Sequence, residues 1–235
     1  MDGFSNLPSC GCSFCSKFKE TVYLSSMILE ILSLMKVHMF VVGRLSTNCY
    51  VVSCPETAEA IVIDPGFDVA FEAEKVTSYV GATSLKVKFI INTHGHADHI
   101  SGNGILKTKY SVPICIHECE ANCLTSQGNN LLPNNISLEN GSLIEFGQVT
   151  LKVIHTPGHT PGSISLISKG FVFTGDTLFS GGIGRTDFPG GSDIDMKASL
   201  LKLMDLPDNY VVYPGHGCIS TIGKEKRVNP FLLWL

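Results

Sequence analysis

The pattern of apolar positions from residue 35 onward predicts a domain in which strands and helices alternate. Short runs rich in β-branched residues, ended by glycine, proline or aspartate, are typical of buried strands. Apolar residues at helical spacing predict helices over 69–80 and 105–110. The expected strands are 37–42, 50–52, 60–63, 86–92, 112–116, 142–146, 149–154, 171–174 and 211–213. This order favours an α/β (α+β) architecture, with one domain over 35–235.

Residues 1–34 have a different pattern and form an N-terminal extension of unassigned role. Cys10, Cys12 and Cys15 have the spacing C-x-C-x2-C, which suits a metal or cluster, but no fourth ligand stands beside them. The apolar segment Thr21–Met35 is too short and too interrupted for a membrane-spanning helix. An appended amphipathic helix and an upstream extension from an early start codon are the two interpretations.

Composition narrows the class of protein. Hydrophobic residues make up 44% of the 235 residues and charged residues 16%, as in soluble globular proteins. The formal net charge of −4, without a run of Lys or Arg, argues against nucleic acid or an anionic membrane as the main partner. Nine cysteines in no regular framework, and no evident secretory signal, predict reduced thiols and a cytoplasmic location.

The most concentrated chemistry lies in Thr93–His99, directly after the expected strand 86–92. Three histidines and an aspartate fall within six residues there: His94, His96, Asp98 and His99. Neutral imidazoles and a carboxylate suit a borderline divalent cation such as Zn²⁺. Loops that follow strands commonly carry the reactive groups of α/β proteins. The segment therefore predicts a metal site.

Three later segments each place a candidate ligand where a strand gives way to a tight turn. These candidates are His159, Asp176 and His216. A lone buried aspartate is costly unless it is paired, and bridging two cations would satisfy both oxygens of Asp176. Five histidines and two aspartates are enough for two metals that share one carboxylate. A set this large, without cysteine, leaves open coordination positions, as catalytic sites do.

Other histidines and cysteines have structural roles in this interpretation. His155 ends a strand and is assigned to packing or hydrogen bonding. The spacing of the second candidate cluster matches no common zinc template, so structural use is favoured for its members, which are Cys115, His117, Cys119 and Cys123.

Two charged positions leave alternatives open. Asp64, at the end of the expected strand 60–63, either caps a turn or orients a metal-ligating histidine. Arg185 either pairs with Asp187 within its glycine-rich loop or contacts a substrate carboxylate.

The combined pattern of H-x-H-x-D-H at 94–99 with His159, Asp176 and His216 resembles the metallo-β-lactamase superfamily, from about residue 35 to the C-terminus. The resemblance implies a four-layer αβ/βα sandwich, two mixed β-sheets flanked by helices, with two divalent metals at one edge. Zn²⁺ is the expected metal, with Fe and Mn as alternatives. Carried over by position, the first metal takes His94, His96 and His159, the second takes Asp98, His99 and His216, and Asp176 bridges them.

Asp176 narrows the resemblance to the short, single-domain hydrolases similar to glyoxalase II (hydroxyacylglutathione hydrolase). Many dinuclear lactamases have cysteine at the matching position, so antibiotic hydrolysis is disfavoured. The supporting motifs are Thr93–Gly102, Gly184–Pro189, Thr221–Glu225 and Asn229–Leu232. The helical domain that helps full-length glyoxalase II to hold glutathione has no counterpart in the 19 residues after His216, so glutathione recognition is not implied.

The expected reaction is hydrolysis of a small acyl-thiol, such as an S-acylglutathione. Two metals lower the pKa of a bound water from about 15.7 towards about 7, and the hydroxide attacks the acyl carbon. Asp98 or Asp176 orients the nucleophile and accepts its proton. The alternative is a persulfide dioxygenase, in which two histidines and a carboxylate (here His94, His159 and Asp176) hold one iron. A non-enzymatic metal-binding protein is a third, minor interpretation.

Overall fold

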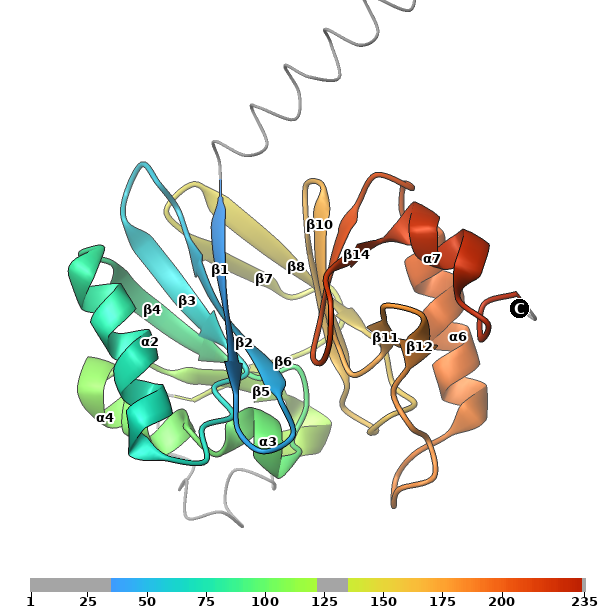
Figure 1. Ribbon diagram of the computed structural model, residues 1–235, viewed down its shortest axis with the longest axis horizontal. Coiled ribbons are helices and arrows are strands. Elements are labelled where there is room, and N and C mark those ends of the chain that lie inside the picture. The colour runs from blue at the N-terminus through green and yellow to red at the C-terminus, as the bar shows by residue number, and fades with distance from the viewer. Residues whose placement is uncertain (1–34, 122–134, 234–235) are drawn as a thin grey trace, which may run out of the picture.

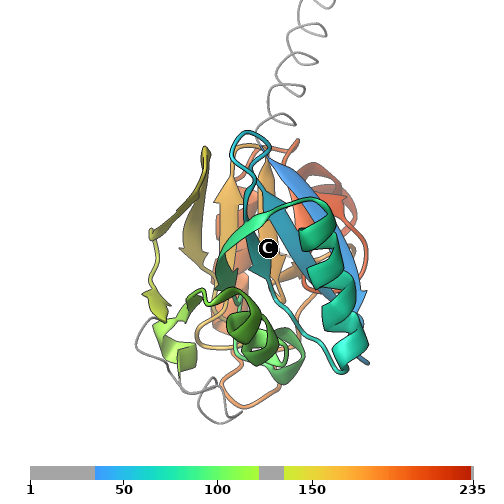
Figure 2. The same ribbon diagram turned by 90° about the vertical axis from the view of Figure 1, so that its left-hand side faces the viewer.

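The computed structural model in Figure 1 describes residues 35–121 and 135–233 of the protein. Two β-sheets face each other, and helices cover the outer side of each sheet (Figures 1 and 2). This is the four-layer αβ/βα sandwich expected from the sequence. The proposed extension, with Cys10, Cys12 and Cys15, lies outside the described residues, as does Cys123.

The first sheet has the strand order β1-β2-β3-β4-β5-β6. β1, β2 and β3 are antiparallel neighbours, whereas β3 to β6 run parallel, joined by crossovers that place α2 and α4 on the outer face. The elements are β1 (Lys36–Val42), β2 (Thr47–Ser53), β3 (Glu59–Ile63), α2 (Ala70–Ala82), β4 (Lys86–Ile91), α3 (Ala97–Ile100), α4 (Asn103–Tyr110), β5 (Ile114–His117), the 3₁₀ helix η1 (Glu118–Glu120) and β6 (Ile136–Leu138).

The second sheet has the order β14-β13-β10-β9-β8-β7, in which only β10 and β13 are parallel neighbours. Helices α6 and α7 cover its outer face (Figure 1). The elements are β7 (Leu143–Phe146), β8 (Val149–His155), β9 (Ile164–Ser168), β10 (Phe171–Gly175), the small hairpin β11 (Leu178–Phe179) and β12 (Gly182–Ile183), α6 (Asp193–Met204), β13 (Val211–Pro214), β14 (Ser220–Thr221) and α7 (Ile222–Val228).

Strand β2 contributes apolar residues to two different cores, one on each face of the first sheet. Tyr50 and Val52 point into the core between the sheets, while Cys49 and Val51 pack with the residues of α2 and α4. Because both faces are covered, the strand is buried throughout and its apolar residues do not alternate with polar ones. Among the described helices, none combines the length and the apolar run that crossing a bilayer requires.

The structure contains elements that the sequence reasoning did not predict, chiefly β9, α6 and α7. Helix α6 buries Met196, Ser199, Leu200 and Leu203, the spacing of one helix face, so its signal was present in the sequence. Strand β2 also begins earlier than expected, because its antiparallel pairing with β1 continues to Thr47 opposite Val42.

The ends of β3 and β4 position the loop that carries the histidine cluster. Ile63 pairs with Ile91, so Asp64 lies beside Thr93. Gly66 then passes so close to α3 that a Cβ on it would lie 1.5 Å from the carbonyl oxygen of Asp98. Only glycine permits this approach, so the turn after β3 fixes the place of the loop.

Truncation of a core leucine tests the packing between the sheets. Leu151 is fully buried, and Leu151→Ala should lower the free energy of unfolding by about 2–5 kcal/mol because it removes methylene contacts and leaves a cavity. The control Leu143→Ala, at a position 60% exposed in the adjacent strand, should change it by no more than about 0.5 kcal/mol. Urea denaturation measures both, and equal losses would contradict this packing.

Candidate metal centre

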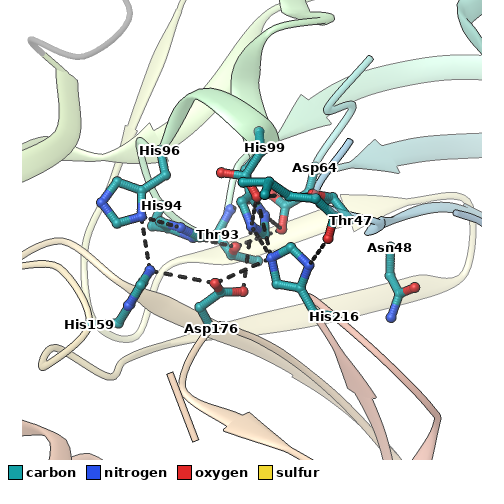
Figure 3. Close-up of polar contacts among 12 residues, drawn as sticks. Thr47, Asn48, Asp64, Thr93, His94, His96, His99, His159, Asp176 and His216 are labelled. Carbon is teal, nitrogen blue, oxygen red and sulfur yellow. Dashed lines mark hydrogen bonds and ion pairs between the residues drawn. The ribbon is translucent and has the colours of Figure 1, made fainter. Parts of the chain in front are cut away.

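All seven candidate ligands lie together beside the ends of β4, β8, β10 and β13. Figure 3 labels six of them, which are His94, His96, His99, His159, Asp176 and His216. His94 and His96 follow β4, and α3 carries Asp98 and His99; both segments belong to the first sheet. The ligands from the second sheet lie after β8, β10 and β13 and are His159, Asp176 and His216.

Pairing within the second sheet brings its ligands together. β10 and β13 run parallel with Gly175 opposite Pro214, so Asp176 and His216 leave the sheet side by side. Gly215 passes so near Asp176 that a Cβ there would lie 2.1 Å from its Oδ1. The turn before His216 therefore has room for the carboxylate only because it carries glycine.

The donor atoms form three overlapping groups, each with its atoms within 4.8 Å of one another. The groups are His94 with His96 and His159; His94 with His99 and Asp176; and Asp98 with His99 and His216. Two of these groups are the ligand sets that the sequence motifs imply: His94, His96 and His159 form the first ligand set, and Asp98, His99 and His216 form the second ligand set. The remaining group, which contains Asp176, takes one histidine from each set and so joins them.

The hydrogen bonds of His99 and His216 turn two lone pairs toward each other. In the neutral form, His99 Nδ1 donates to Asp64 Oδ2 at 2.9 Å, and His216 Nδ1 donates to the Leu45 carbonyl oxygen at 3.1 Å. Both Nε2 atoms then present lone pairs, and they lie 3.3 Å apart. This arrangement is repulsive unless a proton or a cation lies between them.

The same logic applies to His94 and His159. His159 Nδ1 donates to the Arg185 carbonyl oxygen at 2.7 Å, so its Nε2 lone pair points inward. Thr93 gives its hydroxyl proton to Asp64, so its Oγ1 accepts from His94 Nδ1 at 3.2 Å and leaves His94 Nε2 bare. His96 Nδ1 lies 2.9 Å from His159 Nε2 and 3.1 Å from His94 Nε2.

Asp176 has the incomplete bonding that a bridging ligand would show. Its carboxylate is nearly buried, and within the described residues Oδ1 accepts no hydrogen bond, although it lies 3.4 Å from His99 Nε2. Oδ2 lies 3.5 Å from His159 Nε2 and 3.4 Å from His216 Nε2. A buried carboxylate without partners is costly, and cations among these donors would remove that cost. The residues present therefore fit divalent metals.

The charges in the cluster shift the pKa values in opposite directions. Burial lowers the pKa of His99, but the carboxylates of Asp176, Asp64 and Asp98 outweigh it and raise that pKa to about 9. For His216, burial is likewise outweighed by Asp176 and Asp98, and the pKa rises to about 10.

The carboxylates and His94 shift the other way. Burial would raise the pKa of Asp98 and Asp176, but the neighbouring histidines hold both values below the usual range. Burial and the surrounding imidazoles lower the pKa of His94 well below its ordinary value.

Asp64 does not act only as a turn cap. It accepts from Thr93 N at 2.8 Å, from Thr93 Oγ1 at 2.6 Å and from His99 Nδ1 at 2.9 Å. One carboxylate thus orients His99 directly and His94 through Thr93. Histidines whose outer nitrogen is held in this way are typical of metal sites.

His155, His117 and Cys115 have the structural roles that the sequence predicts for them. His155 stacks on His117, with ring centroids 4.2 Å apart, and contacts the Pro161 carbonyl oxygen at 2.8 Å. Among the described residues, neither histidine belongs to a potential metal group. Burial raises the pKa of the Cys115 thiol to about 12, so it is a buried thiol at neutral pH.

Arg185 makes the ion pair that was one of its two expected roles. Its Nε and Nη2 each donate to Asp187 at 2.7 Å, and its guanidinium lies over the Phe188 ring at 3.8 Å. Phe188 in turn meets the His96 ring edge-on, with centroids 5.8 Å apart. These three exposed side chains therefore form a rim beside the first ligand set.

Thr47 and Asn48 are contacts of the site that the sequence reasoning missed. Thr47 Oγ1 donates to Asp98 Oδ2 at 3.0 Å, and Asn48 Nδ2 donates to the carbonyl oxygens of Pro214 and Gly217. No local motif marks either residue, because their partners come from other segments of the chain.

Residues 42–216 match the family described as the metallo-β-lactamase superfamily. Hydroxyacylglutathione hydrolase GloC of Haemophilus influenzae is 34% identical over 213 residues, which cover 84% of this chain and 98% of GloC. Mitochondrial persulfide dioxygenase ETHE1 of Mus musculus is 32% identical over 193 residues, which cover 79% of this chain and 71% of ETHE1.

Solved structures give the same result. The B3 metallo-β-lactamase BLEG-1 superposes with a TM-score of 0.74 at 33% identity, over 84% of this chain and 99% of that one. The di-iron-bound form of TTHA1623 superposes with a TM-score of 0.72 at 34% identity, over 83% of this chain and all of the other (100%). The chain therefore belongs to the metallo-β-lactamase superfamily.

Proposed function

We propose that the protein is a dinuclear metal-dependent hydrolase of thioesters, with S-acylglutathione-type compounds as the substrate class. The observation that carries the proposal is the presence of two complete ligand sets joined by Asp176. The similarity to GloC, which extends over nearly all of that enzyme, supports the thioester assignment. The proposal includes a small acyl-thiol as substrate and a cytoplasmic location.

In this proposal each donor has a stated role. His94, His96 and His159 would hold one metal, Asp98, His99 and His216 would hold the second, and Asp176 would be shared between them. Bound divalent metals, with Zn²⁺ as the expected choice, would supply Lewis acidity and lower the pKa of a bound water.

The carboxylates of Asp98 and Asp176 are the groups that orient and deprotonate the attacking water in this proposal. Because the neighbouring imidazoles hold their pKa values low, Asp98 and Asp176 are ionised at neutral pH. Their oxygens can then accept a hydrogen bond from an attacking water and orient it, and in this proposal one of them takes its proton. The leaving group is a thiolate, which departs without a strong acid, so the reaction needs no additional proton donor near the sulfur. The burial of Asp176 keeps its charge from being screened by solvent.

Arg185 and Phe188 are suited to contact the substrate at the rim. The Arg185 side chain is 55% exposed and paired only with the exposed Asp187 among described acidic groups, so a substrate carboxylate can replace that partner. Phe188 offers a partly exposed ring beside His96, against which an apolar part of the substrate can lie.

Two relatives define the competing activities. The similarity to ETHE1 supports a mononuclear iron oxygenase that would use His94, His159 and Asp176 and leave the second set without a metal. BLEG-1 makes β-lactam hydrolysis a reaction to include in any substrate panel. The dinuclear thioesterase is favoured because the similarity extends over 98% of GloC but over 71% of ETHE1.

Metal content and a substrate panel test the proposed function directly. The purified protein should hold two metals per chain and hydrolyse S-acylglutathiones faster than β-lactams. Elemental analysis and an assay of thiol release measure the two properties. A protein with one iron per chain that consumed oxygen with glutathione persulfide, and released no thiol from any acyl-thiol, would overturn the proposal.

Metal affinity should rise with pH. In the metal-free protein His99 and His216 carry protons at neutral pH, since their pKa values are about 9 and about 10. Zn²⁺ must displace these protons, so its affinity should increase as pH rises through the neutral range and level off above about 10.

Calorimetry in two buffers of different ionisation enthalpy at pH 7 would reveal the proton release. Identical binding enthalpies in the two buffers would argue against protonated ligands. The same titration at higher pH should show fewer protons released.

Replacing the bridging carboxylate should disable the centre. Asp176→Asn should lower kcat/KM for an S-acylglutathione by about 100-fold or more, because the amide neither bridges cations well nor accepts the proton. The control Asp208→Asn removes an exposed carboxylate paired with Lys226 and should leave kcat/KM within about twofold. Unchanged activity in Asp176→Asn would remove the residue from the mechanism.

A further inference from the structure

Thr47 contacts the proposed second ligand set at its centre. Its hydroxyl donates to Asp98 Oδ2, the same oxygen that lies 3.4 Å from His99 Nε2 and 3.3 Å from His216 Nε2. Thr47 has no solvent exposure, so its hydroxyl is not shared with bulk water. Figure 3 shows Thr47 beside His216, on the side of the cluster away from His159. The hydroxyl therefore fixes which way the Asp98 carboxylate turns.

The backbone around Thr47 fixes His216 by separate bonds. Thr47 forms an antiparallel bridge with His216, and Asn48 N donates to the Gly215 carbonyl oxygen at 2.7 Å. The Leu45 carbonyl oxygen accepts from His216 Nδ1. These contacts use main-chain atoms of residues 45–48, which we call the β1–β2 segment. A change confined to the Thr47 side chain should therefore leave His216 in place.

The turn between β1 and β2 is itself anchored on the first turn of α2. Gly43 N donates to Glu72 Oε1 at 2.8 Å, and the backbone and Nε of Arg44 donate to Asp68 Oδ2 at 2.8 and 2.9 Å. Glu72 Oε2 also accepts from Asp68 N at 2.8 Å. Thr47 is thus presented by a braced turn rather than by a free hairpin, as a positioning group must be.

The first ligand set has different supports. His94 is held by Thr93, His159 by the Arg185 carbonyl oxygen, and His96 contacts both imidazoles. The hydrogen bonds of the β1–β2 segment reach Asp98 and His216 instead. Asp64 is shared, since it orients His99 directly and His94 through Thr93, whereas the Thr47 hydroxyl bonds to Asp98 of the second set, so a change at Thr47 can weaken that set by itself.

We propose that Thr47 is a positioning residue that determines whether the second metal is retained. The inference rests on the proposed function, because it requires a second metal on Asp98, His99 and His216. Without the hydroxyl, Asp98 loses a donor and the constraint on its rotation, while the first set keeps all of its supports. Loss of a partner that orients a metal ligand typically lowers metal affinity by about 10- to 100-fold.

Two substitutions at position 47 separate the hydroxyl from the shape of the side chain. Thr47→Val keeps the branched shape that suits a strand and removes the donor. Thr47→Ser keeps the donor and removes a methyl group. Thr77→Val is a matched control, because Thr77 is a largely buried threonine on α2 whose hydroxyl bonds to the Glu74 carbonyl oxygen.

Zn²⁺ binding to the full chain, measured by chelator competition and by metal content after dialysis, is the test. Wild type, Thr47→Ser and Thr77→Val should hold two Zn²⁺ per chain. Thr47→Val should retain one, with the dissociation constant of the other raised about 10- to 100-fold. Thioester hydrolysis by Thr47→Val should recover when Zn²⁺ is added, which damage to the fold would not allow.

Each other outcome counts against one specific claim. Two Zn²⁺ bound by Thr47→Val with unchanged affinity would overturn the role of Thr47 and leave the proposed function standing. A wild-type chain that bound a single metal would instead overturn the dinuclear function. Loss of both metals, or of the circular dichroism of the fold, in Thr47→Val and Thr47→Ser alike would overturn the inference, since Thr47 would then be a general packing residue.

Discussion

The candidate site depends on hydrogen bonds that hold four of its five histidines, His94, His99, His159 and His216, through the ring nitrogen that points away from the cluster. When the outer nitrogen of an imidazole donates to an oxygen, its other nitrogen must present a lone pair, and here those lone pairs converge. The oxygens come from four separate segments and belong to Leu45, Asp64, Thr93 and Arg185. Two of them are backbone carbonyls, so the fold itself, and not only its side chains, sets the direction of the ligands.

This constraint explains why the edge between the two sheets carries the site. One sheet supplies the loop after β4 and helix α3, and the other supplies the turns after β8, β10 and β13. The supporting oxygens cross between the sheets in the same way, since Leu45 of the first holds His216 of the second. Close glycine approaches at Gly66 and Gly215 allow these loops to meet.

The grouping of the candidate ligands could be predicted from the sequence because each of them stands beside a local signal. The cluster at 94–99 is dense, and Asp176 and His216 follow apolar runs that read as strands. Thr47 has no such signal, because its partner Asp98 lies 51 positions away and meets it only because the first sheet places β2, β3 and β4 side by side. The hydrogen bond from His159 to the Arg185 carbonyl oxygen could not be predicted either, because every residue has a backbone carbonyl. Helix α6 differs, because its buried face had a readable period.

Two relatives of similar identity to this chain have different names, a hydrolase in GloC and a dioxygenase in ETHE1. Membership of the superfamily alone therefore separates the two activities poorly. In this chain the segment Leu45–Thr47 holds Asp98 and His216 of the second set, so a change there can alter that set without a change in any candidate ligand.

The origin of the ligands in both sheets also bears on mechanical stability. A metal held by His96 and His159 ties the loop after β4 to the turn after β8, and one held by Asp98 and His216 ties α3 to the turn after β13. Bound cations would then cross-link the two sheets at the polar edge of the sandwich. Opening the sheets at that edge would require releasing the metals first, so resistance to unfolding would follow metal supply.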